Sequence, residues 1–237
     1  MKPFILDETE HYAVVFKPPR MHCAPLKAGT GDTLLDWYAA LFPPIMELSG
    51  KKEGEGGLLH RLDFETQGLV LFAKTQHSLD FLLTQQEDGN FIKEYTATSQ
   101  KPHSSFLTPH SSFPPPPHSS SSVIESFFRP FGPGRKEVRP VVDAVGKDKE
   151  VAKDKGGYYR TEIISVTEIA PEQFSFTLRL RRGFRHQIRC HLAWIGYPVL
   201  NDPIYGTEVK DFLALRASAL VFTDPEKREP REYRIDS

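Results

Sequence analysis

The chain has 237 residues, of which 39% are hydrophobic and 26% charged, and its formal net charge at pH 7 is −1. This length and apolar content are enough for one sizeable or two small soluble domains, and no apolar run is long enough to span a bilayer. The near-neutral charge excludes a globally basic protein, so any charge that binds nucleic acid must be local.

The first residues, 1–7, reach an acid quickly and lack the apolar block of a signal peptide. We therefore expect a cytoplasmic protein. Cys23 and Cys190 are too few and too isolated for a disulfide framework or a cysteine-based metal site. We expect both to be reduced thiols.

Asp63 stands in the most informative segment, between an arginine and two apolar stretches. Residues 58–59 and 69–73 are predicted to be short buried strands, which makes residues 60–68 the loop that joins them. Gly68 permits this loop an unusual backbone angle. Functional residues are commonly placed on such scaffolded loops, and a turn or cap aspartate is the structural alternative.

The middle of the chain changes composition sharply. Residues 78–86 predict a short amphipathic helix and residues 91–98 a strand. The degenerate Pro-His-Ser-Ser-Phe repeat of residues 102–122 cannot bury enough apolar area to offset chain entropy. We predict a flexible insertion there, at about residues 101–122, and a solvated hairpin tip at residues 146–157.

Residues 174–181 alternate apolar and polar side chains, which predicts a half-buried strand, and residues 186–195 predict a helix that Gly196 ends. Five arginines fall within eleven residues that contain no acid: Arg179, Arg181, Arg182, Arg185 and Arg189. Clustered guanidinium groups suit phosphates, and a solvated face is the alternative. Strands outnumber helices without a recurring βαβ alternation, so we predict an α+β fold around a mixed, mainly antiparallel sheet.

Two long motifs occur in order along the chain. The first is His-Arg-Leu-Asp-Phe-Glu-Thr-Gln-Gly at residues 60–68, followed by an apolar strand ending in Ala-Lys. The second is Gly-Phe-Arg-His-Gln-Ile-Arg-Cys-His-Leu at 183–192, with Ile-Gly-Tyr-Pro at 195–198 and Asp-Pro-Ile-Tyr-Gly at 202–206. Together they resemble the motifs of the pseudouridine synthases of the RluA type, and two such matches are hard to obtain by chance.

Shorter echoes of the same family lie at residues 14–18, 93–97 and 213–217, and only residues 101–157 fit it poorly. The chain departs from the family pattern at four positions within these motifs and echoes. Gln67 stands where the family has serine, Phe184 and Arg185 where it has arginine and threonine, and Arg216 where it has histidine. These departures bear on substrate details and leave the class unchanged.

The resemblance implies a single catalytic domain over residues 1–237, built on a bent sheet with flanking helices and a central active-site cleft. Because the match to Lys17-Pro18 lies so near the start, we expect no separate N-terminal RNA-binding domain. The implied activity is isomerisation of specific uridines in ribosomal or transfer RNA to pseudouridine, without a cofactor or a metal. RNA is the expected partner, membranes are not, and a monomer is the default.

By the same resemblance Asp63 is the catalytic aspartate, acting as a nucleophile or as an ion-pair partner for the sugar. A buried carboxylate needs a nearby cation to stay ionised, and Arg189 matches that cation, with Ile188 beside it as a pocket wall. Tyr95 matches the active-site tyrosine, which would stack on uracil or take part in proton removal at carbon 5.

The target uridine in folded RNA is stacked or paired, so it must be extruded before it reacts. Arg61 is placed for phosphate contact or for insertion into the RNA helix, with a structural ion pair as the alternative. Arg182 and Arg185 are predicted to contact RNA. His60 is predicted to be a hydrogen-bonded scaffold residue of the same site.

Two other functions remain open at this point. A metal-dependent hydrolase would use ligand types found at His60, Asp63, His186 and His191, but a five-residue spacing between two of these histidines takes them off one helical face. An RNA-binding protein or RNA chaperone could keep the fold without turnover, as the four departures would allow. The intact Asp63, Tyr95 and Arg189 argue against it.

Overall fold

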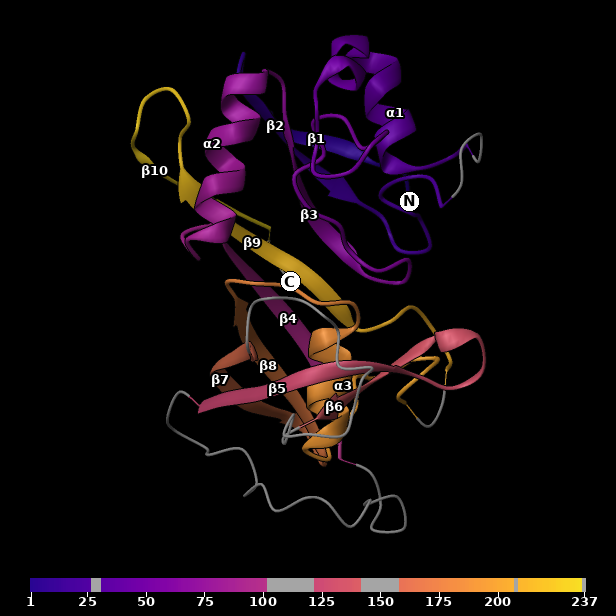
Figure 1. Ribbon diagram of the computed structural model, residues 1–237. Helices are drawn as coiled ribbons and strands as arrows, with labels where there is room; N and C mark the ends of the chain where they lie inside the picture. Colours follow the sequence, from indigo (N-terminus) through magenta and orange to yellow (C-terminus); the bar gives the residue numbers. More distant parts are fainter. Residues whose placement is uncertain (27–30, 102–121, 142–157, 207–208, 236–237) are drawn as a thin grey trace, which may run out of the picture. The chain divides into compact units, whose positions relative to one another are not determined.

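Two segments from opposite ends of the chain, Met1–Glu94 and Arg216–Ser237, form one compact unit, and Tyr95–Leu215 forms a second. The computed structural model in Figure 1 describes residues 1–26, 31–101, 122–141, 158–206 and 209–235. The predicted insertion and the predicted hairpin tip at 146–157 therefore lie almost wholly outside the described residues. The single domain and its central cleft stay predictions.

The first unit is built on a mixed sheet in the order β1-β2-β3-β9, with β10 paired to β9 (Figure 1). Its strands are β1 (Phe4–Glu8), β2 (Tyr12–Lys17), β3 (Gln67–Ala73), β9 (Leu215–Thr223) and β10 (Pro230–Arg234). The pairings of β1 with β2, β2 with β3 and β9 with β10 are antiparallel, and that of β3 with β9 is parallel. The predicted strand at 69–73 is thus confirmed as the centre of this sheet.

β3 is buried on both faces because a helix covers each one. Its side chains alternate, so Leu71 joins the apolar cluster that contains Leu79 and Leu82 of α2 (Gln76–Glu87). On the other face Phe72 stacks on Tyr38 of α1 (Leu34–Leu41), with 4.8 Å between ring centroids. The short 3-10 helix η1 (Pro43–Glu47) follows α1.

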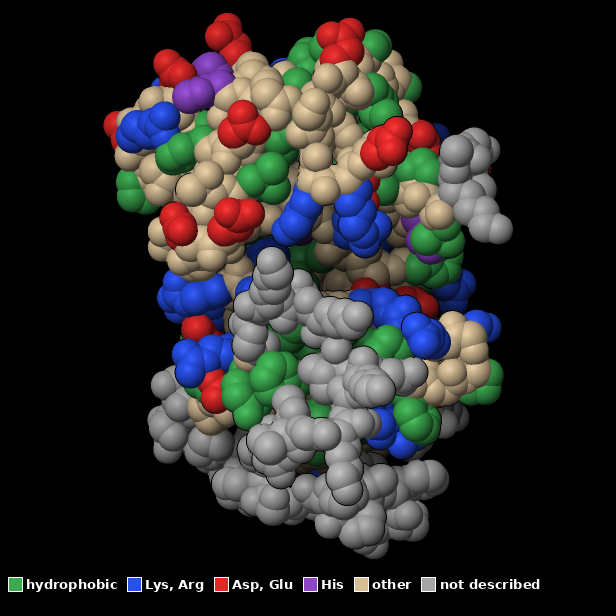
Figure 2. Space-filling model, in the orientation of Figure 1, with side chains coloured by type: hydrophobic (Ala, Val, Ile, Leu, Met, Phe, Trp, Pro, Cys, Tyr) green, Lys and Arg blue, Asp and Glu red, His purple; other side chains and the backbone are tan. Residues whose placement is uncertain are grey.

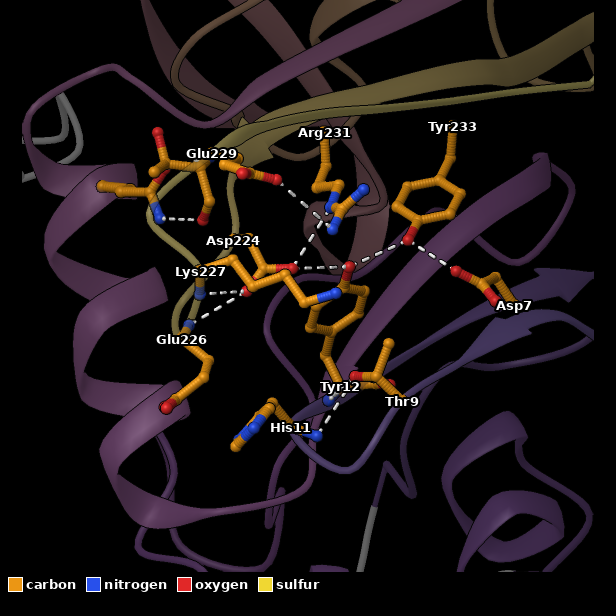
Figure 3. Close-up of polar contacts among 12 residues, drawn as sticks. Asp7, Thr9, His11, Tyr12, Asp224, Glu226, Lys227, Glu229, Arg231 and Tyr233 are labelled. Carbon is orange, nitrogen blue, oxygen red and sulfur yellow. Dashed lines mark hydrogen bonds and ion pairs between the residues drawn. The ribbon is translucent and has the colours of Figure 1, made fainter.

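A chain of polar contacts ties the last strand of this unit to the first two (Figure 3). The Tyr233 hydroxyl on β10 donates to Asp7 Oδ2 at 2.6 Å and lies 2.9 Å from the Tyr12 hydroxyl on β2. Tyr12 in turn donates to Asp224 Oδ2 at 3.3 Å, and Arg231 Nε donates to the same oxygen at 3.2 Å. Burial raises the pKa of both tyrosines, so they remain neutral at pH 7.

The second unit contains strands in the order β4-β8-β7-β5-β6, and the pairings from β8 to β6 are antiparallel. Its strands are β4 (Ile92–Gln100, from Tyr95 onward in this unit), β5 (Ser122–Phe131), β6 (Glu137–Val141), β7 (Tyr159–Ala170) and β8 (Gln173–Leu180). β8 alternates strictly between buried and half-buried side chains, as its sequence predicts. A single turn of 3-10 helix, η3 (Pro133–Arg135), connects β5 to β6.

Helix α3 (Gln187–Trp194) packs against β6 and β7 of this unit. Its first six residues, 187–192, are all buried, so the helix is surrounded and has no wide solvent-facing side. Gly196 follows it with φ +87°, as expected for a residue that ends a helix. The helix predicted at 186–195 is confirmed, with His186 as its left-handed N-cap.

One predicted element is wrong. Residues 58–59 do not form a strand, and Leu58 makes only an isolated antiparallel bridge to Phe72. The Leu58 amide instead donates to the Glu55 carbonyl in a turn, which leaves too short an extended segment for a ladder. None of the helices in the described part of the chain has the length and apolar character of a membrane crossing.

Candidate active site

Asp63 lies half-buried in the loop that leads into β3 in the first unit. The loop is closed by a hydrogen bond from the Thr66 amide to the Asp63 carbonyl oxygen at 3.2 Å. Leu62, the residue before Asp63, is held by Cys23. The Cys23 Sγ accepts a hydrogen bond from the Leu62 amide at 3.1 Å and donates one to the Leu62 carbonyl oxygen at 3.6 Å. Burial raises the pKa of Cys23, so it acts here as a neutral thiol.

Lys17 lies beneath this loop at the end of β2 and has no solvent exposure. Its ammonium group donates to the carbonyl oxygens of Pro18 at 2.9 Å, Met21 at 2.8 Å and Phe64 at 3.4 Å. Burial lowers the pKa of Lys17 to about 8, and the negative charges of Asp63 and Glu65 oppose that shift. The lysine therefore still carries a positive charge at pH 7 beside the Asp63 loop.

Sequence analysis missed this role for Lys17, which entered only as part of a short family echo. A signal was present, because the lysine continues an apolar run, Ala13 to Phe16, in which all side chains are buried. A buried lysine needs several acceptors, and three carbonyl groups meet that need here.

His60 is half-buried and neutral. Its Nε2 accepts a hydrogen bond from the Leu71 amide at 3.3 Å, and its ring lies 5.5 Å from the Phe91 ring. Burial, and then the charge of Lys93, lower the pKa of His60 to about 3. An imidazole that stays neutral at pH 7 and accepts from the backbone supports the loop and is a poor proton donor.

Arg61 points outward and pairs with a carboxylate of the same unit. Its Nη1 lies 3.1 Å from Glu55 Oε1, and the Arg61 side chain is 48% exposed. The structural ion pair considered from sequence therefore exists. An exposed guanidinium can exchange such a partner for a phosphate at little cost, because exposed ion pairs contribute little stability.

Gly68 is needed where β3 meets β9. Its φ is +129°, and a Cβ atom would lie only 2.3 Å from the Ala217 carbonyl oxygen. In the same parallel pairing Gln67 is the register partner of Arg216. Two of the four departures from the family pattern are therefore neighbours across one strand pair.

Arg189 forms an ion pair with Asp202 within the second unit. Its Nε and Nη2 each lie 2.8 Å from an oxygen of Asp202, and neither side chain is exposed. Asp202 also accepts from the amides of Ile204 and Tyr205 at 2.9 and 3.1 Å. Sequence analysis did not assign Asp202, although it belongs to the quoted motif at 202–206. The predicted pairing of Arg189 with Asp63 stays a prediction.

The other two predicted pocket residues also belong to the second unit. Tyr95 on β4 and Ile188 on α3 are both buried, with 6% and 4% exposure. The predicted site residues thus divide between the units: Asp63, His60 and Arg61 in the first, and Tyr95, Ile188, Arg182, Arg185 and Arg189 in the second.

The turn before α3 is held by stacking and by backbone contacts. Phe184 stacks on Phe128 and lies against Tyr159, with centroid distances of 5.0 and 4.9 Å, so this departure from the family fills an apolar cluster. The Arg182 guanidinium lies 4.9 Å from the Tyr159 ring centroid. Nη2 of Arg185 donates to the carbonyl oxygens of Arg135 and Glu137 at 2.6 and 3.1 Å.

These contacts place Arg185 against a basic hairpin that sequence analysis overlooked. The hairpin of β5 and β6 carries the basic side chains Arg129, Arg135, Lys136 and Arg139. Arg139 stacks on Phe131 of the same hairpin, 3.2 Å from its ring centroid, and Figure 2 shows Lys and Arg side chains gathered there. All four fall within residues 129–139, a run that also contains Glu137 and that sequence analysis did not single out.

The metal alternative finds no support in the residues that the structure describes, where no cluster of three His, Cys, Asp or Glu side chains could hold an ion. His191 is buried, with Nδ1 2.8 Å from the Thr161 hydroxyl and Nε2 2.9 Å from the Ser126 hydroxyl. Both ring nitrogens are thus already engaged. Burial lowers the pKa of His191 to about 3, so the ring is neutral.

Residues 11–194 match the family model described as RNA pseudouridylate synthase. A ribosomal large subunit pseudouridine synthase D from Zymomonas mobilis subsp. mobilis is 31% identical over 219 residues, covering 90% of this chain and 59% of that protein. Proteins of the same name from Haemophilus ducreyi and Borreliella burgdorferi are 27% and 25% identical, over 85% of this chain and 52% and 54% of theirs. The chain thus spans somewhat more than half the length of these relatives.

Two solved human structures are similar in fold. RNA Pseudouridylate Synthase Domain Containing 1 has a TM-score of 0.68 at 17% identity, covering 100% of this chain and 84% of that one. RNA Pseudouridylate Synthase Domain Containing 4 has a TM-score of 0.66 at 18% identity, covering 98% and 87%. At these identities the likeness concerns the fold alone, and the predicted α+β class is confirmed.

Proposed function

The chain belongs to the RNA pseudouridylate synthase family, and on this basis we propose that it isomerises specific uridines in RNA to pseudouridine. The observation that carries the proposal is the family match over residues 11–194, which includes the loop of Asp63 and all of α3. The names of the relatives favour ribosomal RNA of the large subunit over transfer RNA. The cytoplasmic location expected from sequence accords with such a substrate.

The proposed reaction is an isomerisation with no net redox change. The bond between C1′ of the ribose and N1 of uracil breaks, the base turns, and a bond forms between C1′ and C5. The proton on C5 leaves, and N1, which is freed from the sugar, takes up a proton, so no atom is added. A carboxylate can open this sequence as a nucleophile at the sugar or as an ion-pair partner for it, and we assign that step to Asp63.

The loop around Asp63 is suited to hold a carboxylate still. Leu62 is fixed on both its amide and its carbonyl by Cys23, and Phe64 accepts from the buried Lys17. Restricted motion of a reacting group increases the rate of reaction, because the entropy of orienting that group has already been lost when the protein folds.

We assign to Tyr95 the stacking on uracil or the proton removal at C5, and to Arg189 the support of the Asp63 charge. Arg189 is suited to a fixed position, because two of its nitrogens are bound to Asp202. Arg61, Arg182 and Arg185 are proposed to contact phosphates, His60 to support the loop, and Ile188 to line the uracil pocket. RNA is the proposed partner.

A chemical map of pseudouridine tests the proposal. Total RNA from cells with and without this gene is treated with carbodiimide, and the modified positions are read as reverse-transcription stops. We expect sites that vanish without the gene and return with the wild-type chain but not with Asp63→Asn. Asp80→Asn, which changes an exposed carboxylate on α2, serves as the matched control and restores them.

If no site changes in any RNA, the isomerase proposal is wrong, and a binding protein without turnover becomes the better description. If Asp63→Asn restores the sites, the family activity stands and the nucleophile assignment is withdrawn.

A further inference from the structure

Phe64 is an exposed aromatic side chain directly beside the proposed catalytic residue. Its side chain is 39% exposed, whereas its neighbours Leu62 and Thr66 in the same loop are buried. A single exposed phenylalanine on a protein surface is ordinary. The contacts of Phe64 distinguish it from that ordinary case.

The first contact is with a second ring from another loop. His22 lies against Phe64 with ring centroids 4.6 Å apart and the ring planes tilted by 38°. His22 itself is half-exposed. The two rings together present a wider aromatic surface than either would alone, and one that still reaches solvent.

The second set of contacts fixes the two loops to each other. The Met21 amide donates to the Phe64 carbonyl oxygen at 3.2 Å, and the buried Lys17 donates to the carbonyl oxygens of both Met21 and Phe64. These backbone contacts place the ring pair before any ligand arrives. A ring that is already ordered loses little conformational entropy when a planar ligand stacks on it.

Unpaired nucleobases are the planar ligands that such a surface fits. Proteins bind single-stranded RNA by stacking unstacked bases on aromatic rings, histidine included, next to cationic side chains that contact the backbone. An exposed arginine precedes each ring in the sequence: Arg20 lies two residues before His22, and Arg61 lies three residues before Phe64. A uridine that has been extruded for reaction leaves its neighbours partly unstacked.

We propose that His22 and Phe64 form a stacking subsite for an unpaired nucleobase that flanks the target uridine. This inference rests on the proposed function for the identity of the neighbouring nucleotide, but the stacking itself does not require turnover. Stacking requires an unpaired base, so the subsite favours an unstacked flanking nucleobase over a paired one. Because stacking reads no hydrogen-bonding groups, the subsite discriminates weakly among the four bases.

Binding of two charge-matched oligomers tests the subsite without reference to activity. The probes are a fluorescein-labelled uridine decamer and a decamer of the same backbone without bases, titrated with the full chain at fixed salt and followed by anisotropy. We expect Phe64→Leu to weaken binding of the uridine decamer by about five- to tenfold and to leave the abasic decamer within about twofold. Phe64→Tyr keeps the ring and should bind like wild type.

Phe4 supplies a matched control variant in the same unit. It is also an exposed phenylalanine stacked on a second ring, with 46% exposure and a 5.0 Å centroid distance to Phe16. Phe4→Leu should bind both decamers like wild type. His22→Ala should weaken the uridine decamer less than Phe64→Leu does, because it removes the support and leaves the exposed ring.

Three results would overturn the subsite: wild-type affinity in Phe64→Leu, an equal loss for both decamers, or the same loss in Phe4→Leu. Base-dependent binding through Phe64 in a protein that modifies no uridine would retain the subsite and reject the isomerase. Isomerisation by a protein whose RNA affinity does not depend on Phe64 would retain the isomerase and reject the subsite.

Discussion

Arg189 and Asp202 form an ion pair with two contacts of 2.8 Å in which both side chains are completely buried. Removing two charges from water is expensive, so the pair persists only because each charge also has other partners. Asp202 accepts from two backbone amides, and the Arg189 guanidinium lies 5.7 Å from the centroid of the Tyr205 ring. The aspartate thus fixes the orientation of the guanidinium that we assign to the catalytic centre.

Asp202→Asn should lower the free energy of unfolding by about 3–5 kcal/mol, because it leaves the buried Arg189 charge without compensation. Urea unfolding at pH 7 measures the change. Glu55→Gln is the control, since it removes the carboxylate of the exposed pair with Arg61 and should cost less than about 1 kcal/mol. Equal effects of the two changes would show that burial does not set the strength of the Arg189 pair.

The local sequence pattern was sufficient to predict the strands and the helix in which apolar side chains recur at a regular spacing. The strand of residues 69–73, the strict alternation of β8, and the helix ended by Gly196 all follow from side-chain period and one glycine, and the structure confirms them. The false strand at residues 58–59 shows the limit of this approach. Two consecutive apolar residues fit a strand pattern, but the spacing of apolar residues does not predict the turn contacts that the surrounding chain makes.

Only those residues of the candidate site that lie in the long motifs could be predicted from the sequence. Asp63 and Arg189 were selected because each stands in a long motif, whereas Lys17 and Cys23 act through contacts between distant parts of a unit. Cys23 binds Leu62 across 39 positions of sequence. Such contacts depend on tertiary packing, so a one-dimensional pattern carries no direct record of them.

Gly68→Ala should destabilise the first unit by roughly 1–3 kcal/mol or more. The added Cβ would lie 2.3 Å from the Ala217 carbonyl oxygen, and φ at +129° is strained for any residue with a side chain. Gly31→Ala is the matched control, because nothing lies within 4 Å of its Cβ position. Thermal unfolding of both variants measures the difference, and an equal midpoint would contradict the close approach of β3 to β9.

His191 predicts a pH dependence of stability with a definite sign. Burial lowers its pKa from 6.5 to about 3 in the folded protein, so between these values the unfolded chain binds one more proton than the folded one. The free energy of unfolding should therefore be fully retained above pH 6.5 and fall as the pH decreases, by up to about 1.4 kcal/mol per pH unit from this residue.

Urea unfolding at pH 7, 6 and 5 measures that slope in the wild-type chain and in His191→Gln. The variant should be less stable at pH 7, because it disturbs contacts to Ser126 and Thr161, yet its slope should be smaller. His60, whose pKa is also lowered to about 3, continues to contribute in the variant. An unchanged slope in His191→Gln would mean that His191 is not buried as a neutral ring.

Arg182 and Arg185 predict how RNA binding responds to salt. Arg182 is held over Tyr159 and Arg185 against the hairpin of β5 and β6, so both guanidinium groups are ordered at the surface of the second unit. Replacing both with alanine should reduce the slope of log K against log salt by roughly 1.4–1.8, the value for two lost phosphate contacts. Binding of a short RNA stem-loop between low and physiological salt measures it.

Arg228→Ala is the control for this pair, because Arg228 is likewise stacked, 3.8 Å from the Phe81 ring centroid, but lies in the first unit outside the proposed phosphate surface. Its slope should equal that of the wild type. Arg185→Ala alone also removes two contacts to the hairpin, so circular dichroism and the unfolding midpoint are compared first. A folded double variant with the wild-type slope would remove both arginines from the RNA-binding surface and leave Arg61 and the hairpin arginines as its remaining candidates.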